Sequence, residues 1–249
     1  MKNKMTKFAV AIIAVLGWFA CDNENDNVEN EMLNDLPLVE VTTDGYTNVL
    51  TSNLKTVLAS ETTSPLSGEE EGLLLMREEE LLAHDVYSLF GDLYALKIFS
   101  NITSSEATHA QAMLDLLNLF GLEDPATGVA GTYTNETLQS LYTELTEKGK
   151  VSVEEALQVG AYIEEVDIKD LEDLMGETEN EEILLVYDNL QRGSRNHLRA
   201  FVKVLKSYDI VYVPSVLTQE DFDAIITSDI EKGNGSRNSY RYQHGNRGN

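Results

Sequence analysis

The sequence has little cysteine and few basic residues. Its 249 residues include one cysteine, and 18 lysines and arginines against 43 aspartates and glutamates. A single cysteine excludes a framework of disulfides within the chain. The formal net charge of −25 argues against binding to nucleic acid, which requires basic patches. It also argues against electrostatic adhesion to anionic lipid, whereas it is compatible with attraction of metal cations.

The first twenty residues have the features of a cleaved export signal. Three lysines precede an apolar run from Phe8 to Phe19 that is too short to span a bilayer, and Ala20 stands before the cysteine. This segment resembles a bacterial lipoprotein signal, which implies lipidation of Cys21. We therefore expect residues 1–20 to be a signal peptide and the protein to be exported to the bacterial cell envelope, periplasmic or at the cell surface, with a lipid anchor at Cys21. Ordinary cleavage near Ala20 is the alternative.

Hydrophobic periodicity predicts helices through most of the remaining chain, with no repeats and no convincing strands. Residues 21–64 are expected to be an acidic tether containing a candidate short helix. A helical domain follows over residues 65–230, with four long helices and a short helix, at 135–149, in the long crossover between the second and third. Residues 231–249 are expected to be a disordered tail. The pattern indicates an all-α protein, an antiparallel four-helix bundle.

Each of the four long helices carries an apolar stripe at steps of three and four residues, and each stripe turns polar once, near its middle. No lysine or arginine lies on any stripe. The interrupting residues are, in chain order, Glu80, Glu106, His109, Glu164, Asp167 and His197. The other two members of the Glu78–Glu80 run are expected on the solvated face.

Burial makes these polar residues candidate metal ligands. An unpaired carboxylate in an apolar core costs on the order of several kcal/mol, so buried carboxylates are paired or bind metal. Four carboxylates and two neutral imidazoles suit two divalent cations, since their charges then sum to about zero. Oxygen and imidazole ligands together favour iron, manganese or zinc over calcium. We therefore predict one or two metal ions bound by these six residues; neutral hydrogen-bonded pairs and internal salt bridges are the alternatives.

The first two stripes resemble the rubrerythrin pattern of the ferritin-like superfamily. In that pattern one helix supplies a glutamate followed by alanine three and tyrosine seven residues later, as Glu80, Ala83 and Tyr87 do here. The second helix supplies Glu-x-x-His, which Glu106 and His109 match. The resemblance implies a ferritin-like bundle with its metal site at mid-height.

The last two stripes match that pattern in part. The third helix of the family supplies two acids three residues apart, as Glu164 and Asp167 do. The fourth supplies Glu-x-x-His, but here Ser194 stands where the metal-bridging glutamate is expected, three residues before His197. A dinuclear centre, a mononuclear centre, and a centre completed by His84 or water therefore all remain open.

Four segments of the chain more specifically resemble a bacterial ferritin-like family, domain-of-unknown-function family 2202. They read REEELLAHDVY, SSEATHAQAM, VGAYIEEVDIKDL and RGSRNHLRAF, and the resemblance spans about residues 66–208. The family implies the fold but brings no assigned reaction. Three functions are compatible with it: metal-dependent oxidoreduction of oxygen or peroxide, a non-catalytic metal-binding carrier, or a structural envelope bundle without metal. The expected partners are metal ions and the membrane through the anchor, and a homo-oligomer is compatible with the pattern.

Overall fold

The computed structural model describes residues 31–42, 44, 46–59, 65 and 68–244, with side chains to residue 240. The predicted signal peptide and the predicted lipidation site Cys21 lie outside the described residues. Within these described ranges, no helix is both long and apolar enough to cross a bilayer.

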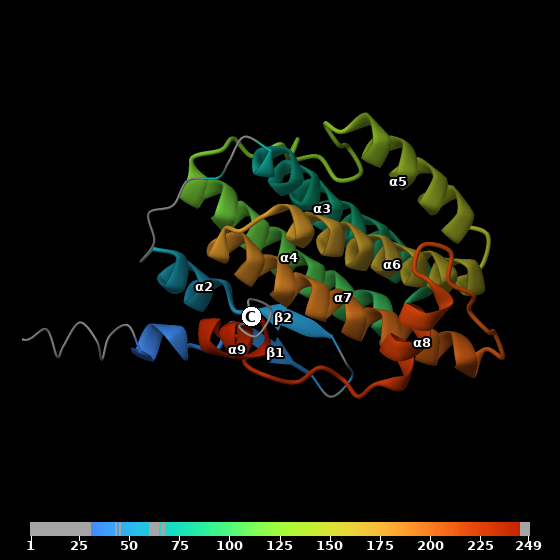
Figure 1. Cartoon of the computed structure of the whole chain (residues 1–249). Coiled ribbons are helices and arrows are strands. Elements are labelled where there is room, and N and C mark those ends of the chain that lie inside the picture. The colour runs from blue at the N-terminus through green and yellow to red at the C-terminus, as the bar shows by residue number, and fades with distance from the viewer. Residues whose placement is uncertain (1–30, 43, 45, 60–64, 66–67, 245–249) are drawn as a thin grey trace, which may run out of the picture.

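Four long helices lie side by side along most of their length (Figure 1). They are α3 (Glu69–Tyr94), α4 (Lys97–Phe120), α6 (Val153–Glu177) and α7 (Glu181–Ser207). Helix α3 packs against α4 and α6, and α7 packs against α6 and α4. The chain is therefore mostly helical, as the periodicity predicts.

Short turns join α3 to α4 and α6 to α7, and the two helices of each pair pack against each other. Helix α3 continues past Gly91, the predicted end, to Tyr94, and stops at Ala95, whose left-handed backbone (φ 53°) lets its N–H bond the Gly91 carbonyl. Helix α4 therefore begins early enough to bring its middle level with the middle of α3. Helix α6 begins at the predicted N-cap Ser152, whose side chain accepts a hydrogen bond from the Glu155 N–H.

Two short helices cover the outside of this arrangement. Helix α5 (Glu136–Gly149), in the crossover between α4 and α6, packs against α3 and α6. Asn135 caps it by accepting from the N–H groups of Thr137 and Leu138. Helix α8 (Gln219–Thr227) follows α7 and packs against it.

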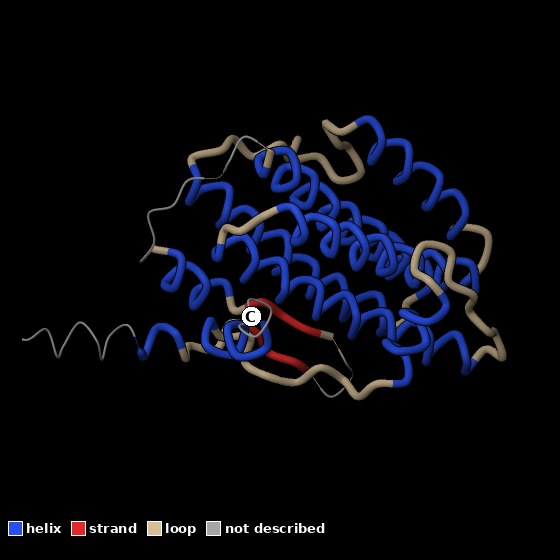
Figure 2. The backbone as a smooth tube through the Cα atoms, viewed as in Figure 1, coloured by secondary structure: helices blue, strands red, loops and turns tan. Residues whose placement is uncertain are grey.

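A small β-hairpin, which the sequence analysis did not predict, lies beside α4 and α7 (Figure 2). Strands β1 (Val39–Val41) and β2 (Thr47–Val49) pair antiparallel and lead into α2 (Thr51–Leu58). The Val49 N–H donates to Thr108 Oγ1 on α4 at 2.9 Å. Strands of three residues are too short to reveal an alternating pattern. The segment 38–58, expected to belong to an acidic tether, is thus a packed part of the fold.

The C-terminal segment is likewise more ordered than predicted. Residues 231–244 were expected to be a disordered tail, but they return along α7 and end in α9 (Arg237–His244). The side chain of Asn189 on α7 donates to the Gly235 carbonyl at 3.1 Å, and Arg237 pairs with Glu182 at 3.4 Å. Polar side chains on α7 hold this segment, so its low apolar content was a poor guide.

A polar layer divides the core into two apolar clusters. One cluster lies toward the α5 and α8 end and includes Ala83, Tyr87, Phe90, Ile102, Leu157 and Phe201. The other lies toward the hairpin and α2 and includes Leu73, Met76, Met113, Leu116, Leu171 and Leu190. On α3, α4 and α7, the polar residues predicted as ligands stand between members of the two clusters, and on α6 they lie before Leu171 of the second cluster.

Candidate metal centre

The six predicted ligands are all buried in this polar layer. Glu80 comes from α3, Glu106 and His109 from α4, Glu164 and Asp167 from α6, and His197 from α7. None has more than 2% of its surface exposed. The helix stripes therefore do converge at one level of the core, as the sequence predicts.

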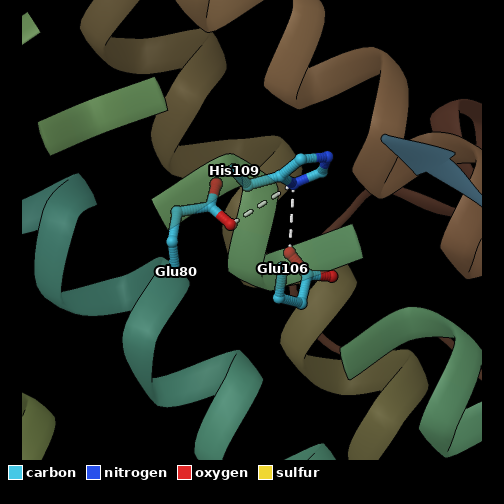
Figure 3. A group of neighbouring side chains, drawn as sticks. All are labelled: Glu80, Glu106 and His109. Atoms are coloured by element: carbon cyan, nitrogen blue, oxygen red, sulfur yellow. Dashed lines mark ion pairs between the residues drawn. The ribbon is translucent and has the colours of Figure 1, made fainter. Parts of the chain in front are cut away.

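Glu106 lies at the centre of the layer, between two imidazole rings. Its Oε2 is 3.0 Å from His109 Nδ1, and its Oε1 is 2.9 Å from His197 Nδ1. Glu80 reaches His109 Nδ1 from the other side, at 3.4 Å, as Figure 3 shows. The Glu106 carboxylate thus faces both rings, with one oxygen toward each ring.

The two halves of the layer are alike. Glu164 Oε2 lies 3.4 Å from His197 Nδ1, as Glu80 does from His109. The two rings stack with centroids 5.4 Å apart and planes 17° from parallel. Each half brings three ligand atoms within 4.8 Å of one another: Glu80, Glu106 and His109 in one, and Glu106, Glu164 and His197 in the other. Glu106 is common to both.

The outer nitrogens of the rings face strand β2. His109 Nε2 lies 2.9 Å from the Thr47 carbonyl oxygen. Because a carbonyl only accepts, Nε2 carries a proton. Ser105 Oγ donates to the same carbonyl and lies 3.1 Å from His197 Nε2, which the Thr47 N–H also approaches, at 3.4 Å. Thr47 of β2 therefore contacts the outer nitrogen of each ring: its carbonyl accepts from His109 Nε2 and its N–H donates to His197 Nε2, so that both Nδ1 atoms face the carboxylates.

The inner atoms of the layer have no hydrogen-bond partner among the described residues. These atoms are both oxygens of Glu80 and of Glu106, Oε2 of Glu164, Oδ2 of Asp167, and Nδ1 of both rings. The carboxylates of Glu80, Glu106 and Glu164 contact the imidazoles instead. Among the described residues, no lysine or arginine forms an ion pair with the carboxylates of the layer. Buried polar atoms normally find partners. The residues present therefore fit a bound cation.

Burial and crowding set the pKa values of the carboxylates. Burial raises the pKa of Glu80 to about 8 and that of Glu164 to about 7, although nearby His109 and His197, respectively, act in the other direction. Burial followed by the charge of Glu80 raises the pKa of Asp167 well above its usual value. Glu106 differs, because the charges of both histidines outweigh burial and hold its pKa well below the usual range.

The two rings take up protons when no metal competes. Burial alone would lower the pKa of His197, but the charges of Glu106 and Glu164 raise it to about 9. The same opposition raises the pKa of His109 well above its usual value, through Glu106 and Glu80. A proton and a metal ion are thus alternative cations for Nδ1 of each ring.

Two further side chains adjoin the groups. Tyr87 lies 2.7 Å from Glu164 Oε1, to which its hydroxyl donates, and so holds that carboxylate in place. Asp167 belongs to neither group of three, although the charges of Glu80 and Glu164 add to the effect of burial and raise its pKa. It is the one predicted ligand that the structure sets apart.

His84 and Ser194 belong to neither group of ligand atoms. His84 is partly exposed and pairs with Asp85 at 3.0 Å. Ser194 is buried, but its hydroxyl bonds the Leu190 carbonyl of its own helix at 3.2 Å. Gly193 instead faces the site: a Cβ there would lie 2.7 Å from His109 Nε2. The missing side chain at Gly193 makes room for the ring.

The prediction for the two glutamates before Glu80 was wrong. Glu78 and Glu79 were expected on a solvated face, but both are buried. Glu78 caps the start of α5, accepting from the Asn135 N–H at 3.0 Å, and burial followed by the charge of Asp170 raises the pKa of Glu79 well above its usual value. Glu165, adjacent to Glu164, turns away and accepts from the N–H groups of residues 215–217.

The residues that sequence reasoning missed are those behind the rings, Thr47 and Ser105. Asn196, next to His197, donates to Thr47 Oγ1 at 2.8 Å and fixes the strand from α7. Short polar side chains beside Glu106 and His197 were a weak signal for Ser105 and Asn196. Thr47 carried none, since its role belongs to a backbone carbonyl.

Comparison with known proteins places the helical part of the chain in a recognised group. The model of a family described as an uncharacterized protein domain (DUF2202) matches residues 69–229. The uncharacterized protein MJ0754 of Methanocaldococcus jannaschii is 46% identical over 171 residues, which are 68% of this chain and 92% of the relative. The crystal structure of hypothetical protein MJ0754 from Methanococcus jannaschii superposes with a TM-score of 0.67 at 44% identity, covering 69% of this chain and 99% of that chain.

The family match includes the predicted ligands but not the hairpin that contacts the two histidine rings. All six predicted ligands fall inside residues 69–229, whereas β1 and β2 come before that range. Thr47, whose backbone contacts both rings, therefore lies outside the matched domain.

Proposed function

The chain belongs to the DUF2202 family, and we propose that it is a ferritin-like antiparallel four-helix bundle that binds two divalent metal ions in its polar layer. We further propose that these ions serve the oxidoreduction of oxygen or peroxide. The residues assigned to metal binding are Glu80, Glu106, His109, Glu164 and His197, with Asp167 beside them.

One observation carries the proposal: Nδ1 of His109 faces two carboxylates while Nε2 donates to a carbonyl. In a neutral ring with its proton on Nε2, Nδ1 presents a lone pair to Glu80 and Glu106, which repels them. A cation between these atoms turns the repulsion into coordination, and a neutral imidazole held from behind by a hydrogen bond is the usual form of a histidine ligand.

The shared position of Glu106 supports two ions rather than one. Each of its oxygens faces a different ring, so one carboxylate can serve both groups of ligands. This arrangement does without the bridging glutamate that Ser194 replaces. The carboxylates of Glu80, Glu106, Glu164 and Asp167 would balance the charge of two divalent ions.

The donor set favours a reactive site over a closed structural one. Each group of three offers two carboxylates and one imidazole, which leaves coordination positions for water or a small substrate. Oxygen and nitrogen donors of this kind suit iron, manganese or zinc. A bound redox metal would supply electron transfer to the substrate, while the chain's own residues exclude bulk water and hold the ligands: Tyr87 fixes Glu164, and β2 fixes both rings. The single cysteine, Cys21, cannot form a cysteine cluster, so electrons must come from an outside donor.

Two other functions are supported by specific observations. The lack of a second bridging glutamate at Ser194 would weaken retention of the ions, which suits a non-catalytic carrier. The raised pKa values of His109 and His197 would let protons close the layer without metal, which suits a structural bundle.

Metal content and turnover distinguish the three functions. Protein purified without added metal is analysed for metal content, then loaded with iron or manganese and assayed for oxygen and peroxide consumption with an added electron donor. Two redox metals per chain with turnover support the enzyme. Bound metal without turnover supports the carrier, and protein that neither contains nor takes up metal supports the structural bundle and contradicts our proposal.

The cellular location that we propose rests on the leader sequence alone. We propose that residues 1–20 are removed and that Cys21 is lipidated, holding the protein in the cell envelope. Membrane fractionation of the full chain and of a Cys21→Ala variant tests this. Equal release of both variants into the soluble fraction would contradict the anchor.

A further inference from the structure

We propose that Asp170, Glu79 and Asp167 form an outer cation site through which divalent ions reach the polar layer. This inference rests on the proposed function, because a route is needed only if the layer binds metal. It assigns to Asp167 a role in transit, in keeping with its position outside the two groups of ligand atoms.

A pocket between α3, α5 and α6 reaches the polar layer from outside. Its cavity volume is about 10 Å³, which is room for about one water molecule or one small ion. Glu79 on α3 and Asp167 on α6 supply its carboxylates, and the remaining lining is Leu82, Leu138, Leu141, Tyr162, Ile163 and Val166. In Figure 1, α5 lies over α3 and α6 on this side of the molecule.

The carboxylates in this pocket have oxygens without partners. Glu79 Oε2 and Asp167 Oδ2 have no hydrogen-bond partner, although the two residues are only 5% and 2% exposed. Unpartnered buried oxygens lining a pocket are what a transient cation site requires. Acidic residues alone would not indicate such a site, since most acids of this chain are solvated.

The three acids form a sequence from the surface to the centre. Asp170 is half-buried, one helical turn beyond Asp167 on α6, and its charge helps burial to raise the pKa of Glu79. Asp167 follows, and its strongest charged neighbours are Glu80 and Glu164, which belong to the two groups of ligands. An ion entering at Asp170 therefore meets carboxylate oxygens at each stage.

Among the described residues, the opposite side of the layer is covered by backbone. There, β2 covers the rings, and the Thr47 carbonyl accepts from both His109 and Ser105. On α7, the backbone at Gly193 lies directly against the His109 ring. The unpartnered carboxylate oxygens of the pocket instead lie on α3 and α6.

The rate of metal uptake tests the route. Cobalt(II) is mixed with the metal-free full chain in a stopped-flow instrument, and its absorbance reports binding; release is followed with excess chelator. We expect Glu79→Gln and Asp170→Asn to slow uptake and release by the same factor, about tenfold, because a route changes both rate constants and leaves affinity unchanged. The matched control is Glu172→Gln, which removes one exposed charge from α6.

Three results would overturn the inference. Uptake and release rates equal to those of the wild type in both variants would show that the route lies elsewhere, while the proposed function would stand. Faster release with weaker affinity would make Glu79 a ligand. A wild-type chain that binds no cobalt would refute the proposed function and the route together. Two variants, each close in shape to the native side chain, guard against misreading a folding defect.

Discussion

His109 donates from Nε2 to the carbonyl oxygen of Thr47 across 2.9 Å, although 62 positions separate the two residues. This contact joins a short strand outside the matched family domain to the centre of the polar layer. It also decides which ring nitrogen faces the carboxylates. The hairpin is therefore part of the candidate metal centre, although it supplies no ligand atom.

Substitution of Ser105 by alanine tests this support. The change removes the hydroxyl that donates to the Thr47 carbonyl and lies 3.1 Å from His197 Nε2. Loss of a partner behind a histidine ligand typically weakens metal binding about 10–100-fold. We expect that loss in a calorimetric titration with manganese, with the far-UV circular dichroism spectrum unchanged. Ser104→Ala is the control, because Ser104 is exposed and bonds only its own helix; equal effects of the two variants would contradict the assigned role.

Substitution of Gly193 by alanine tests the close approach of α7 to His109. The added Cβ would lie 2.7 Å from Nε2, so the ring must move away from its carboxylate partners. We expect loss of metal binding and a decrease of about 1–3 kcal/mol in the free energy of unfolding, measured with urea. Gly176→Ala adds the same methyl group to a helix in open space and should be neutral or stabilising by about 0.5–1 kcal/mol. Unchanged metal binding in Gly193→Ala would refute the placement of the ring.

Substitution of Tyr87 by phenylalanine should weaken one of the two ions selectively. Tyr87 fixes Glu164 at 2.7 Å, and Glu164 belongs only to the group that contains His197. We expect the second ion to bind about tenfold more weakly while the first is unaffected, in a titration that resolves two steps. Tyr94→Phe is the control, since that hydroxyl bonds the Gly149 carbonyl in another part of the chain. Equal weakening of both ions would argue against two separate groups.

The stability of the metal-free protein should fall as the pH rises. The pKa of His197 is raised to about 9 and that of Glu80 to about 8 in the folded state, so both groups bind protons more tightly when folded. The folded chain then carries more protons than the unfolded chain, and stability is lost as the pH rises from 4.5 to about 8 through Glu80 and from 6.5 to about 9 through His197. Glu106, with its lowered pKa, has the opposite effect only under acidic conditions.

Urea unfolding at several pH values, with and without manganese, measures this effect. We expect a loss on the order of 1–3 kcal/mol for the metal-free chain between pH 6 and pH 9. With saturating metal the loss should be absent or reversed, because metal binding displaces protons from both rings. Metal-free stability that does not change over this range would show that the buried layer binds no extra protons.

The long helices and the buried polar residues of their stripes could be predicted because helix periodicity is a strong signal over many turns. Each stripe of apolar residues breaks at one level, and the structure brings those breaks together. Glu164 and Glu165 were separable by the same reasoning, since only Glu164 keeps the three-and-four spacing. Asp167 also keeps that spacing. It lies one helical turn beyond Glu164, however, and belongs to neither group of ligand atoms.

The rest depends on contacts between distant parts of the chain. Strands of three residues carry no periodic pattern, and Thr47 acts through its backbone, which no side-chain motif records. The tail after residue 230 is polar, yet Asn189 and other polar side chains of α7 hold it. Glu78 and Glu79 are buried because α5 covers α3. The sequence of α3 alone does not predict where a helix of the crossover packs.

The number of tightly bound divalent ions per chain, in the wild type and in Glu106→Gln, is the most direct test of the account. Both proteins are dialysed against manganese and analysed for metal content, with Glu71→Gln as an exposed control on α3. Because Glu106 faces both rings, the account predicts two ions in the wild type and the control and nearly none in Glu106→Gln. A Glu106→Gln protein that retains both ions, or a wild type that binds none, would contradict it.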